Sequence, residues 1–318
     1  MSLIKKIYKM NFENNLKRKD FQNVICNFFV VGFSKSGTSW LARMLKNNDD
    51  IFVPDSKEIH YFNEEGIGIS NITNPNKSRS IEWYHNHFKE SKNKLNGDFS
   101  PLYILSSAKN IKQYNKDAKI VILIRDPISR TISDYKYRIQ KGWLSIDTNF
   151  EKAVQKYPEI INHSLYSEKI SNYIQTFKKE QLLILFYDDI KENPGFLLDK
   201  CTDFLGVKNC DKRELFKKVN KTNLPKNQKI IFFLVKIKIF FMRIGLHDFV
   251  RFIASSKYFK KYLNFISNDI IEDKSINKVK IPNRFLKLFL TDIKKLEIIV
   301  SKDLSIWSKE IINLKSEL

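Results

Sequence analysis

Three short apolar runs alternate with amphipathic stretches along the chain. The runs are NFFVVGF at 27–33, KIVILI at 119–124 and QLLILF at 181–186, and apolar residues at helical spacing lie around 104–116, 128–140 and 165–179. Strands that are apolar on both faces and alternate with helices are typical of a parallel sheet covered on both sides. The pattern predicts an α/β fold with a central parallel sheet flanked by helices. Ligand sites in such sheets gather at the carboxyl ends of the strands.

The remaining segments predict how the rest of the chain is organised. A chain of 318 residues can form one large α/β domain, which we expect over residues 27–318, after a polar extension at 1–26. The loop-rich stretch 56–96 predicts an insertion near 63–96 beside the site, and we expect another near 228–280. Apolar residues at helical spacing over 284–312 predict one closing core helix.

The chain is strongly basic, with 56 Lys and Arg against 35 Asp and Glu, which gives a formal net charge of +21. A field of this sign favours acidic small molecules, polyanions or anionic membrane surfaces. The excess is largely Lys spread along the chain rather than clustered in one segment. We therefore expect no dedicated nucleic-acid partner.

The segment 228–263 is both apolar and basic, and its charges interrupt any span long enough to cross a membrane. It predicts amphipathic helices packed on the core, with peripheral contact to an anionic membrane as the alternative.

The N-terminal stretch lacks the apolar run of a secretory signal. Cys26, Cys201 and Cys210 have neither metal-ligand nor CxxC spacing. We expect a cytoplasmic protein, either free or peripheral at the inner membrane face.

A glycine-bearing loop joins the first apolar run to the first helical stretch. Such a turn directs backbone N–H groups at one spot, where the positive end of the helix dipole also lies, so it forms an anion cradle. A Walker A loop places its lysine directly after its second glycine, whereas Lys35 precedes Gly37 here, which argues against an ATPase. The predicted anion-binding residues are Ser34, Lys35, Ser36, Gly37, Thr38, Ser39 and Trp40.

A second polar motif follows the run at 119–124 and begins with Arg125. Asp126 suits the N-cap of the next helix, and Pro127 suits its first turn. An arginine at a strand end can donate two N–H bonds to one phosphate. Ser133, about two helical turns further on, can donate to the same group. The motif predicts a phosphate-binding position at this strand end.

The loop GFSKSGTSW and the pair Arg125 and Ser133 resemble the two motifs with which sulfotransferases hold the nucleotide sulfate donor PAPS. The resemblance implies a P-loop-like sulfotransferase fold, with the loop on the 5′-phosphosulfate, Arg125 and Ser133 on the 3′-phosphate, and PAP as the product. It implies no requirement for a metal ion. Residues 220–226 are similar to a late Asn…Pro-Arg segment of bacterial members, which implies that Lys221 and Lys226 cover the 3′-phosphate.

Residues 57–62, KEIHYF, resemble the Lys-Glu-x-x-x-Phe-Phe region of glycan sulfotransferases that act on heparan sulfate. This resemblance implies Glu58 as the general base and His60 as a neighbour that orients the acceptor, while Lys35 stabilises the departing PAP. Residues 97–103 are similar to a Gly-Glu-Lys-Thr-Pro-x-Tyr segment of the same enzymes, except that Phe99 stands where they carry a lysine. We therefore expect sulfuryl transfer to a hydroxyl or amine of a small molecule, a saccharide or a glycolipid.

Two other classes of function are compatible with these residues. A P-loop-like kinase for a small molecule would use ATP and Mg²⁺, although the Walker lysine is absent. A non-catalytic basic protein would bind a membrane surface or nucleic acid through charge alone. Preference for PAP over ADP would separate a sulfotransferase from both.

Overall fold

The computed structural model describes residues 25–64, 74–208 and 279–316, together with short stretches between 210 and 271. The chain divides into two compact units, of which the first comprises Met1–Arg130, His163–Val219 and Lys287–Leu318, and the second Thr131–Asn162 and Asn220–Leu286. The division falls inside two helices, α5 (Pro127–Gln140) and α14 (Asn283–Val300). The single domain over 27–318 therefore stays a prediction, and residues 1–24 of the expected extension lie outside the described part.

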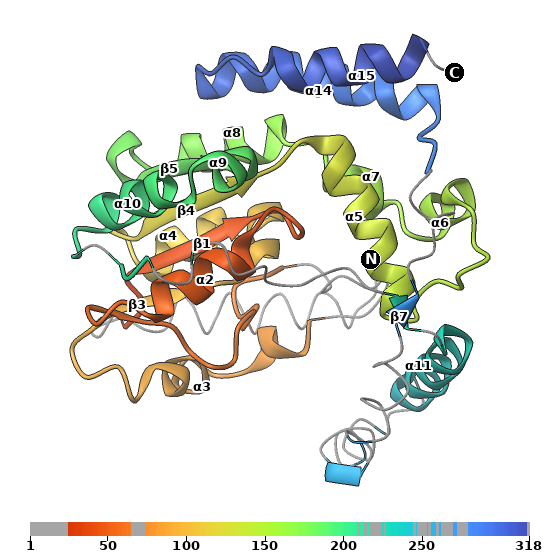
Figure 1. Cartoon of the computed structure of the whole chain (residues 1–318). Helices are drawn as coiled ribbons and strands as arrows, with labels where there is room; N and C mark the ends of the chain where they lie inside the picture. The colour runs from red at the N-terminus through yellow and green to blue at the C-terminus, as the bar shows by residue number, and fades with distance from the viewer. Residues whose placement is uncertain are drawn as a thin grey trace. The chain divides into compact units, whose positions relative to one another are not determined.

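The first unit is built on a five-stranded parallel sheet with strand order β2-β3-β1-β4-β5 (Figure 1). Its strands are β1 (Phe28–Gly32), β2 (Ile51–Phe52), β3 (Leu95–Asp98), β4 (Lys119–Ile124) and β5 (Leu182–Phe186). The predicted parallel sheet is confirmed, and its three apolar runs form β1, β4 and β5. The sequence pattern does not predict β2 and β3, because one is only two residues long and the other, LNGD, is mostly polar.

Alternate residues of the central strands face two separate cores. Phe28 and Val30 of β1 and Val121 and Leu123 of β4 belong to one buried apolar cluster. Two helices complete that cluster, namely α2 (Thr38–Lys46) and α10 (Pro194–Leu205). Because α2 follows directly after the β1 loop, this packing fixes the loop against the sheet.

The other core is rich in aromatic side chains. The ring of Phe29 on β1 lies 5.8 Å from that of Phe62 and 6.3 Å from those of Tyr103 and Tyr114. Tyr173 donates its hydroxyl to the carbonyl of Tyr103 at 2.7 Å. The elements on this side are η3 (Pro101–Leu105), α4 (Ala108–Tyr114) and α8 (Ser167–Thr176). The predicted amphipathic stretches are thereby confirmed as α4, α5 and α8.

The segment between β2 and β3 is more ordered than its composition predicts. It contains η1 (Pro75–Ser78), α3 (Ile81–His85) and η2 (Asn86–Phe88), and Ser80 caps α3 by accepting from the N–H of Trp83 at 3.3 Å. Tyr84 and Phe88 are buried, and the Tyr84 ring stacks on Tyr61 at 5.0 Å. The expected loop-rich character is wrong over 75–88, because these aromatic residues pack into the core, while the insertion beside the site stays a prediction. Residues 65–73 lie outside the described part.

Two helices, rather than the single predicted one, close the chain. α14 ends at Val300, Ser301 adopts a left-handed φ of 50°, and α15 (Ser305–Ser316) follows. The break is stabilised because Asp303 accepts from the N–H of Ser305 and Glu297 accepts from that of Leu304, both at 2.8 Å. The role as core helices is confirmed, since Leu296 of α14 and Ile311 of α15 are buried.

The second unit contains the remainder of α5, with α6 (Phe150–Lys156), α7 (Glu159–Asn162) and α11 (Gln228–Arg243). A short antiparallel pair joins β6 (Leu224–Pro225) to β7 (Ile270–Ile271). The ring of Tyr135 on α5 packs edge-on against Phe150 of α6 at 5.6 Å. Among the described residues, no helix is both long and apolar enough to cross a membrane. Much of the expected insertion 228–280 lies outside the described part.

The parallel arrangement places the carboxyl ends of the five strands along one edge of the sheet. The loop 33–37 follows β1, Arg125 follows β4, and the short helix α9 (Tyr187–Glu192) follows β5. Residues 53–60 follow β2, and residues 99–100 follow β3. The predicted donor loop and the predicted base therefore share this edge.

Candidate active site

The loop after β1 has the backbone of an anion cradle. Lys35 and Gly37 both take left-handed conformations, with φ of 76° and 96°. Gly37 is the N-cap of α2 and has no side chain with which to cap the first turn, so the N–H groups of that turn face the loop. A Cβ on Gly37 would lie 2.7 Å from Ile190 Cδ1 and 2.9 Å from Tyr187 Cδ2. The position therefore requires glycine for its conformation and for the close approach of α9.

Arg125 lies directly against this loop. Its Nη1 donates to the carbonyl of Lys35 at 3.2 Å, and its guanidinium lies 4.4 Å from the centroid of the Tyr187 ring. The buried Nε of Arg125 finds no hydrogen-bond partner among the described residues, and neither does the buried Oγ of Ser36. Buried polar atoms without partners are rare in folded proteins. Two of them at neighbouring strand ends indicate a place for a polar ligand.

Arg130 also contacts the backbone of this loop, although the sequence motifs gave it no role. It is fully buried, and its Nη1 donates to the carbonyl of Ser34 at 3.3 Å. Its Nε donates to the hydroxyl of the buried Ser164. At the start of the same helix, Asp126 accepts from the N–H groups of Ile128 at 3.3 Å and Ser129 at 2.6 Å. The predicted N-cap at Asp126 is thereby confirmed.

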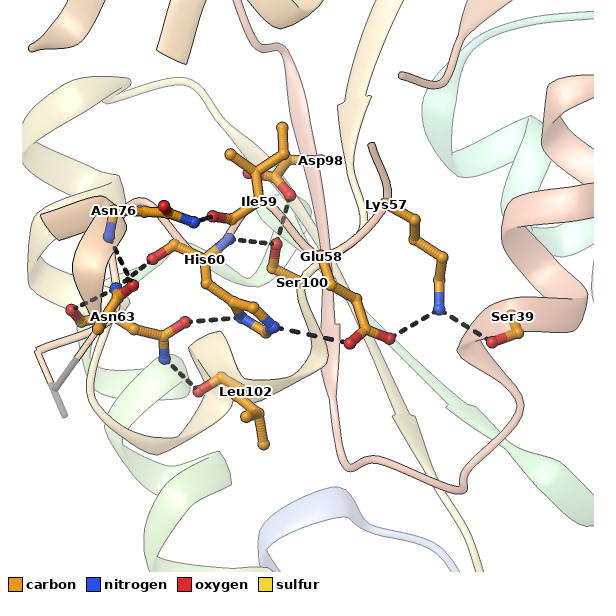
Figure 2. A network of polar contacts seen from close by, with 11 residues as sticks. Ser39, Lys57, Glu58, Ile59, His60, Asn63, Asn76, Asp98, Ser100 and Leu102 are labelled. Carbon is orange, nitrogen blue, oxygen red and sulfur yellow. Dashed lines mark hydrogen bonds and ion pairs between the residues drawn. The ribbon is translucent and has the colours of Figure 1, made fainter. Parts of the chain in front are cut away.

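Glu58 is joined to the loop through Lys57 (Figure 2). Lys57 Nζ lies 2.9 Å from Oγ of Ser39, in the first turn of α2, and 3.0 Å from Glu58 Oε1. The other carboxylate oxygen of Glu58 lies 3.6 Å from Nε2 of the buried His60. Asn63 donates its amide to the carbonyl of Leu102 at 2.8 Å, so its oxygen accepts from His60 Nδ1 at 3.0 Å. This fixes the His60 ring with Nε2 toward Glu58.

Lys57 and, when its ring carries both protons, His60 thus place positive charge beside a carboxylate that is still 47% exposed. Partial burial favours the protonated acid, but the hydrogen bonds and charges of His60 and Lys57 outweigh it and lower the pKa of Glu58 to about 2. Glu58 is therefore ionised at any pH near neutrality. Its exposed side remains open to a substrate.

The backbone around Glu58 is held in an unusual conformation by the end of β3. Glu58 and His60 have φ of 66° and 54°, a region that residues with a side chain seldom adopt. The N–H of Glu58 donates to the carbonyl of Phe99 at 3.1 Å, and that of His60 to Ser100 Oγ at 3.1 Å. Strained backbone of this kind persists only where the surroundings determine it, and it concentrates at functional sites.

The support for this segment is the buried carboxylate of Asp98 at the end of β3. It accepts hydroxyl hydrogen bonds from Ser100 at 2.7 Å, Tyr103 at 2.9 Å and Tyr84 at 3.0 Å. Burial raises the pKa of Asp98, although the three hydroxyls oppose that effect. The Ser100 hydroxyl in turn accepts from the backbone N–H of His60, so that Asp98 fixes His60 through Ser100 (Figure 2). Phe99 is buried in the core with its ring 5.9 Å from that of Phe28.

The family model of the sulfotransferase domain matches residues 27–265, which include the β1 loop, Glu58 and Arg125. The chain belongs to the sulfotransferase family. A crystal structure of a sulfotransferase from Alicyclobacillus acidocaldarius has the same fold, with a TM-score of 0.60 and 22% identity, over 89% of this chain and 98% of that one.

Curated sulfotransferases match part of the chain. The membrane-associated sulfotransferase kil1 of Dictyostelium discoideum is 27% identical over 210 residues, covering 58% of this chain and 40% of its own length. The human heparan sulfate glucosamine 3-O-sulfotransferase 5 is 28% identical over 195 residues, covering 56% of this chain and 52% of its own length. The chain thus spans about half or less of the length of these relatives.

Within this sulfotransferase fold, the residues predicted to bind the nucleotide fall into three groups. Ser36, Ser39 and the backbone of residues 35–38 lie at the helix N-terminus, and Thr38 is buried beside them. Trp40 points away, because its indole N–H donates to the carbonyl of Leu215 at 3.1 Å. Ser133 is partly buried on α5 and belongs to the second unit, and Lys221 and Lys226 lie outside the described residues. The roles of these residues stay predictions.

Sequence motifs alone did not point to four residues that shape the site. Lys57 and Tyr187 contact the predicted residues directly, whereas Arg130 and Asp98 hold their backbone in place. Lys57 and Asp98 lie inside the matched motifs, so their position beside Glu58 and Ser100 was the available signal. Arg130 likewise lies between Arg125 and Ser133 of the second motif, whereas Tyr187 lies in neither motif and reaches the loop because it follows β5.

Proposed function

We propose that the chain transfers a sulfuryl group from PAPS to a hydroxyl of a saccharide or glycolipid, with Glu58 as the general base. The observation that carries this proposal is the Lys57 side chain, which contacts both Glu58 and Ser39. It places a carboxylate that is ionised near neutrality beside the first turn of α2, where an anion would bind. Proton removal from an acceptor and stabilisation of a leaving phosphate are then possible within one site.

The donor end of the site fits a nucleotide with phosphate groups. Ser36 Oγ and Arg125 Nε are buried donors whose hydrogen-bonding capacity phosphate oxygens would satisfy. Ser34 to Ser39 would hold the 5′ end, Arg125 would hold the 3′-phosphate, and Lys35 would neutralise charge on the leaving PAP. PAPS supplies the sulfuryl group when it is bound. Ser133, Lys221 and Lys226 are proposed to complete the 3′-phosphate contacts on the family resemblance.

Glu58 would take the proton of the acceptor hydroxyl at its exposed carboxylate edge, and His60 would orient the acceptor. A carboxylate with a pKa of about 2 is a weak base, because accepting a proton sacrifices its contacts with Lys57 and His60. Oxyanions beside Ser39 would compete for Lys57 and weaken its pair with Glu58. The proton affinity of Glu58 would then rise when the donor site is loaded.

The acceptor class and the location rest on the relatives. A saccharide acceptor is supported by the heparan sulfate glucosamine 3-O-sulfotransferases, and an association with a membrane by the membrane-associated sulfotransferase kil1. The strong positive charge of this chain suits an anionic saccharide or glycolipid.

The experiment compares E58Q with the wild type and with E90Q, which changes an exposed glutamate after η2. Radiolabelled PAPS is the donor, and heparosan, N-sulfated heparan oligosaccharides and a glycolipid extract are the acceptors. Loss of the base should lower kcat by about 10²–10⁴-fold in E58Q, while PAP raises the Tm of all three proteins equally. Loss of the PAP response in E58Q would instead assign Glu58 to the donor site. A wild type that labels none of these acceptors would contradict the acceptor class.

A further inference from the structure

Helix α11 presents an apolar stripe to solvent. Ile230, Phe233, Ile237 and Phe240 are 42%, 62%, 37% and 59% exposed. Their spacing of three and four residues places them on one side of the helix, where they form what we call the α11 stripe. Contiguous apolar surface of this kind marks an interaction site in a folded protein.

The opposite side of α11 is docked on the turn that follows α5. The buried amide of Gln228 donates to the carbonyls of Ile139 and Leu144, the latter at 3.1 Å. Gly142 has a left-handed φ of 69°, and a Cβ there would lie 3.0 Å from Ile231 Cγ2 and from the backbone of Ile231 and Phe232. This close approach holds the helix by one face. The α11 stripe is therefore a surface feature rather than an unfinished part of the core.

The charged residues of α11 itself all have one sign. Lys229, Lys236 and Lys238 are exposed, and the helix sequence QKIIFFLVKIKIFFMR contains no acidic residue. Burial lowers the pKa of Lys156 on α6, and repulsion from Lys236 lowers it further, so cations are concentrated here. A second copy of the chain on this stripe would bring like charges together, whereas an anionic surface would be complementary to it.

We propose that the α11 stripe inserts into the headgroup region of an anionic membrane, with the flanking lysines on the lipid phosphates. A convex helix face with aromatic and aliphatic side chains between lysines has the form of an interfacial helix that lies in the membrane plane. A protein partner would need a groove lined with acidic residues to receive the same face. The proposal does not depend on sulfuryl transfer, but it names the surface through which the protein would reach membrane-borne acceptors.

The test is flotation of the full chain with vesicles of phosphatidylcholine alone or mixed with phosphatidylglycerol. The wild type should bind the mixed vesicles, and F233S/F240S should bind them about tenfold more weakly or worse, because two apolar anchors are lost. F196S is the matched control, since Phe196 is 53% exposed on α10 and also has a lysine, Lys200, over its ring. It should bind like the wild type. K229E/K236E should also lose about tenfold or more.

The proposal is overturned if the wild type ignores the mixed vesicles, or if F196S loses as much binding as F233S/F240S. Sedimentation velocity adds a further outcome. A wild-type dimer that dissociates in F233S/F240S, without any vesicle binding, would make the stripe a self-association surface and would also overturn the proposal. The rise in Tm with PAP, measured on the same variants, should be unchanged. A failure of the membrane proposal is thereby kept separate from a failure of the donor site.

Discussion

At the scale of single residues, the charge state of Glu58 is set by its two neighbours. Lys57 and His60 keep the pKa of this half-exposed carboxylate at about 2, well below its ordinary value of 4.5. The active form of a general base is the carboxylate, so activity is lost as the pH falls through the pKa. Any change that raises the pKa of Glu58 must therefore move the acid limb of the rate profile upward.

We predict that K57M raises the pKa of Glu58 toward 4.5, because it removes both a hydrogen bond and a positive charge. The acid limb of kcat/KM, which reports the free enzyme, should rise with it. Titration of the Glu58 side-chain carbon by NMR measures the shift directly. K46M is the control, since Lys46 pairs with the exposed Asp55 instead. An unchanged pKa of Glu58 in K57M would refute the assigned role of Lys57.

Sequence reasoning at this scale singled out Lys35, Glu58 and Arg125, because each lies in a short local motif, and their roles stay predictions. It could not reach the contact between Lys57 and Ser39, which are eighteen residues apart and meet only because β1 and β2 are parallel strands of one sheet. It also predicted that Trp40 binds the nucleotide; the indole N–H donates to the carbonyl of Leu215, and the role of Trp40 stays a prediction. Local patterns predict the residue types of the site but not their partners.

At the scale of elements, the junction between β1 and α2 depends on Gly37. Its left-handed φ and the contact of α9 both exclude a side chain. G37A should lower the free energy of unfolding by roughly 1–3 kcal/mol and should weaken PAP binding, because the first turn of α2 must shift. Urea denaturation with and without PAP measures both effects.

G195A is the matched control for this substitution. Gly195 lies in the first turn of α10, and a Cβ there would lie 3.6 Å from the nearest atom, in ordinary contact. We expect a neutral or slightly stabilising effect, within about 1 kcal/mol, because alanine restricts the unfolded chain. An equal loss of stability in both variants would contradict a specific requirement for glycine at position 37.

The elements themselves were predictable where a pattern of several residues repeats. The three apolar runs and the amphipathic stretches became β1, β4, β5, α4, α5 and α8. The polar strand β3 was not predictable, since its inner position comes from pairing with β1 and β2 rather than from its own residues. The break at Ser301 was missed because the apolar spacing continues across it and the backbone reversal carries no glycine or proline.

At the scale of the whole molecule, the first unit holds the loop after β1, Glu58 and Arg125, and the second unit holds the α11 stripe. The sheet gathers residues from five separate stretches of sequence at the carboxyl ends of its strands. This position of the site was predictable from the fold class alone, because ligands bind at the carboxyl ends of the strands of parallel sheets. The sequence motifs did not predict the division into two units, because the second unit combines two stretches that are far apart in the sequence, 131–162 and 220–286.

The central claim is that this edge binds a nucleotide with a 3′-phosphate. Calorimetric titration with PAP, and separately with ADP and Mg²⁺, tests it most directly, at moderate salt that screens the general positive field. A charge-assisted contact is worth about 1.5–3 kcal/mol, so PAP should bind roughly tenfold tighter or more, and R125M should lose that preference. Equal or tighter binding of ADP by the wild type would contradict the account.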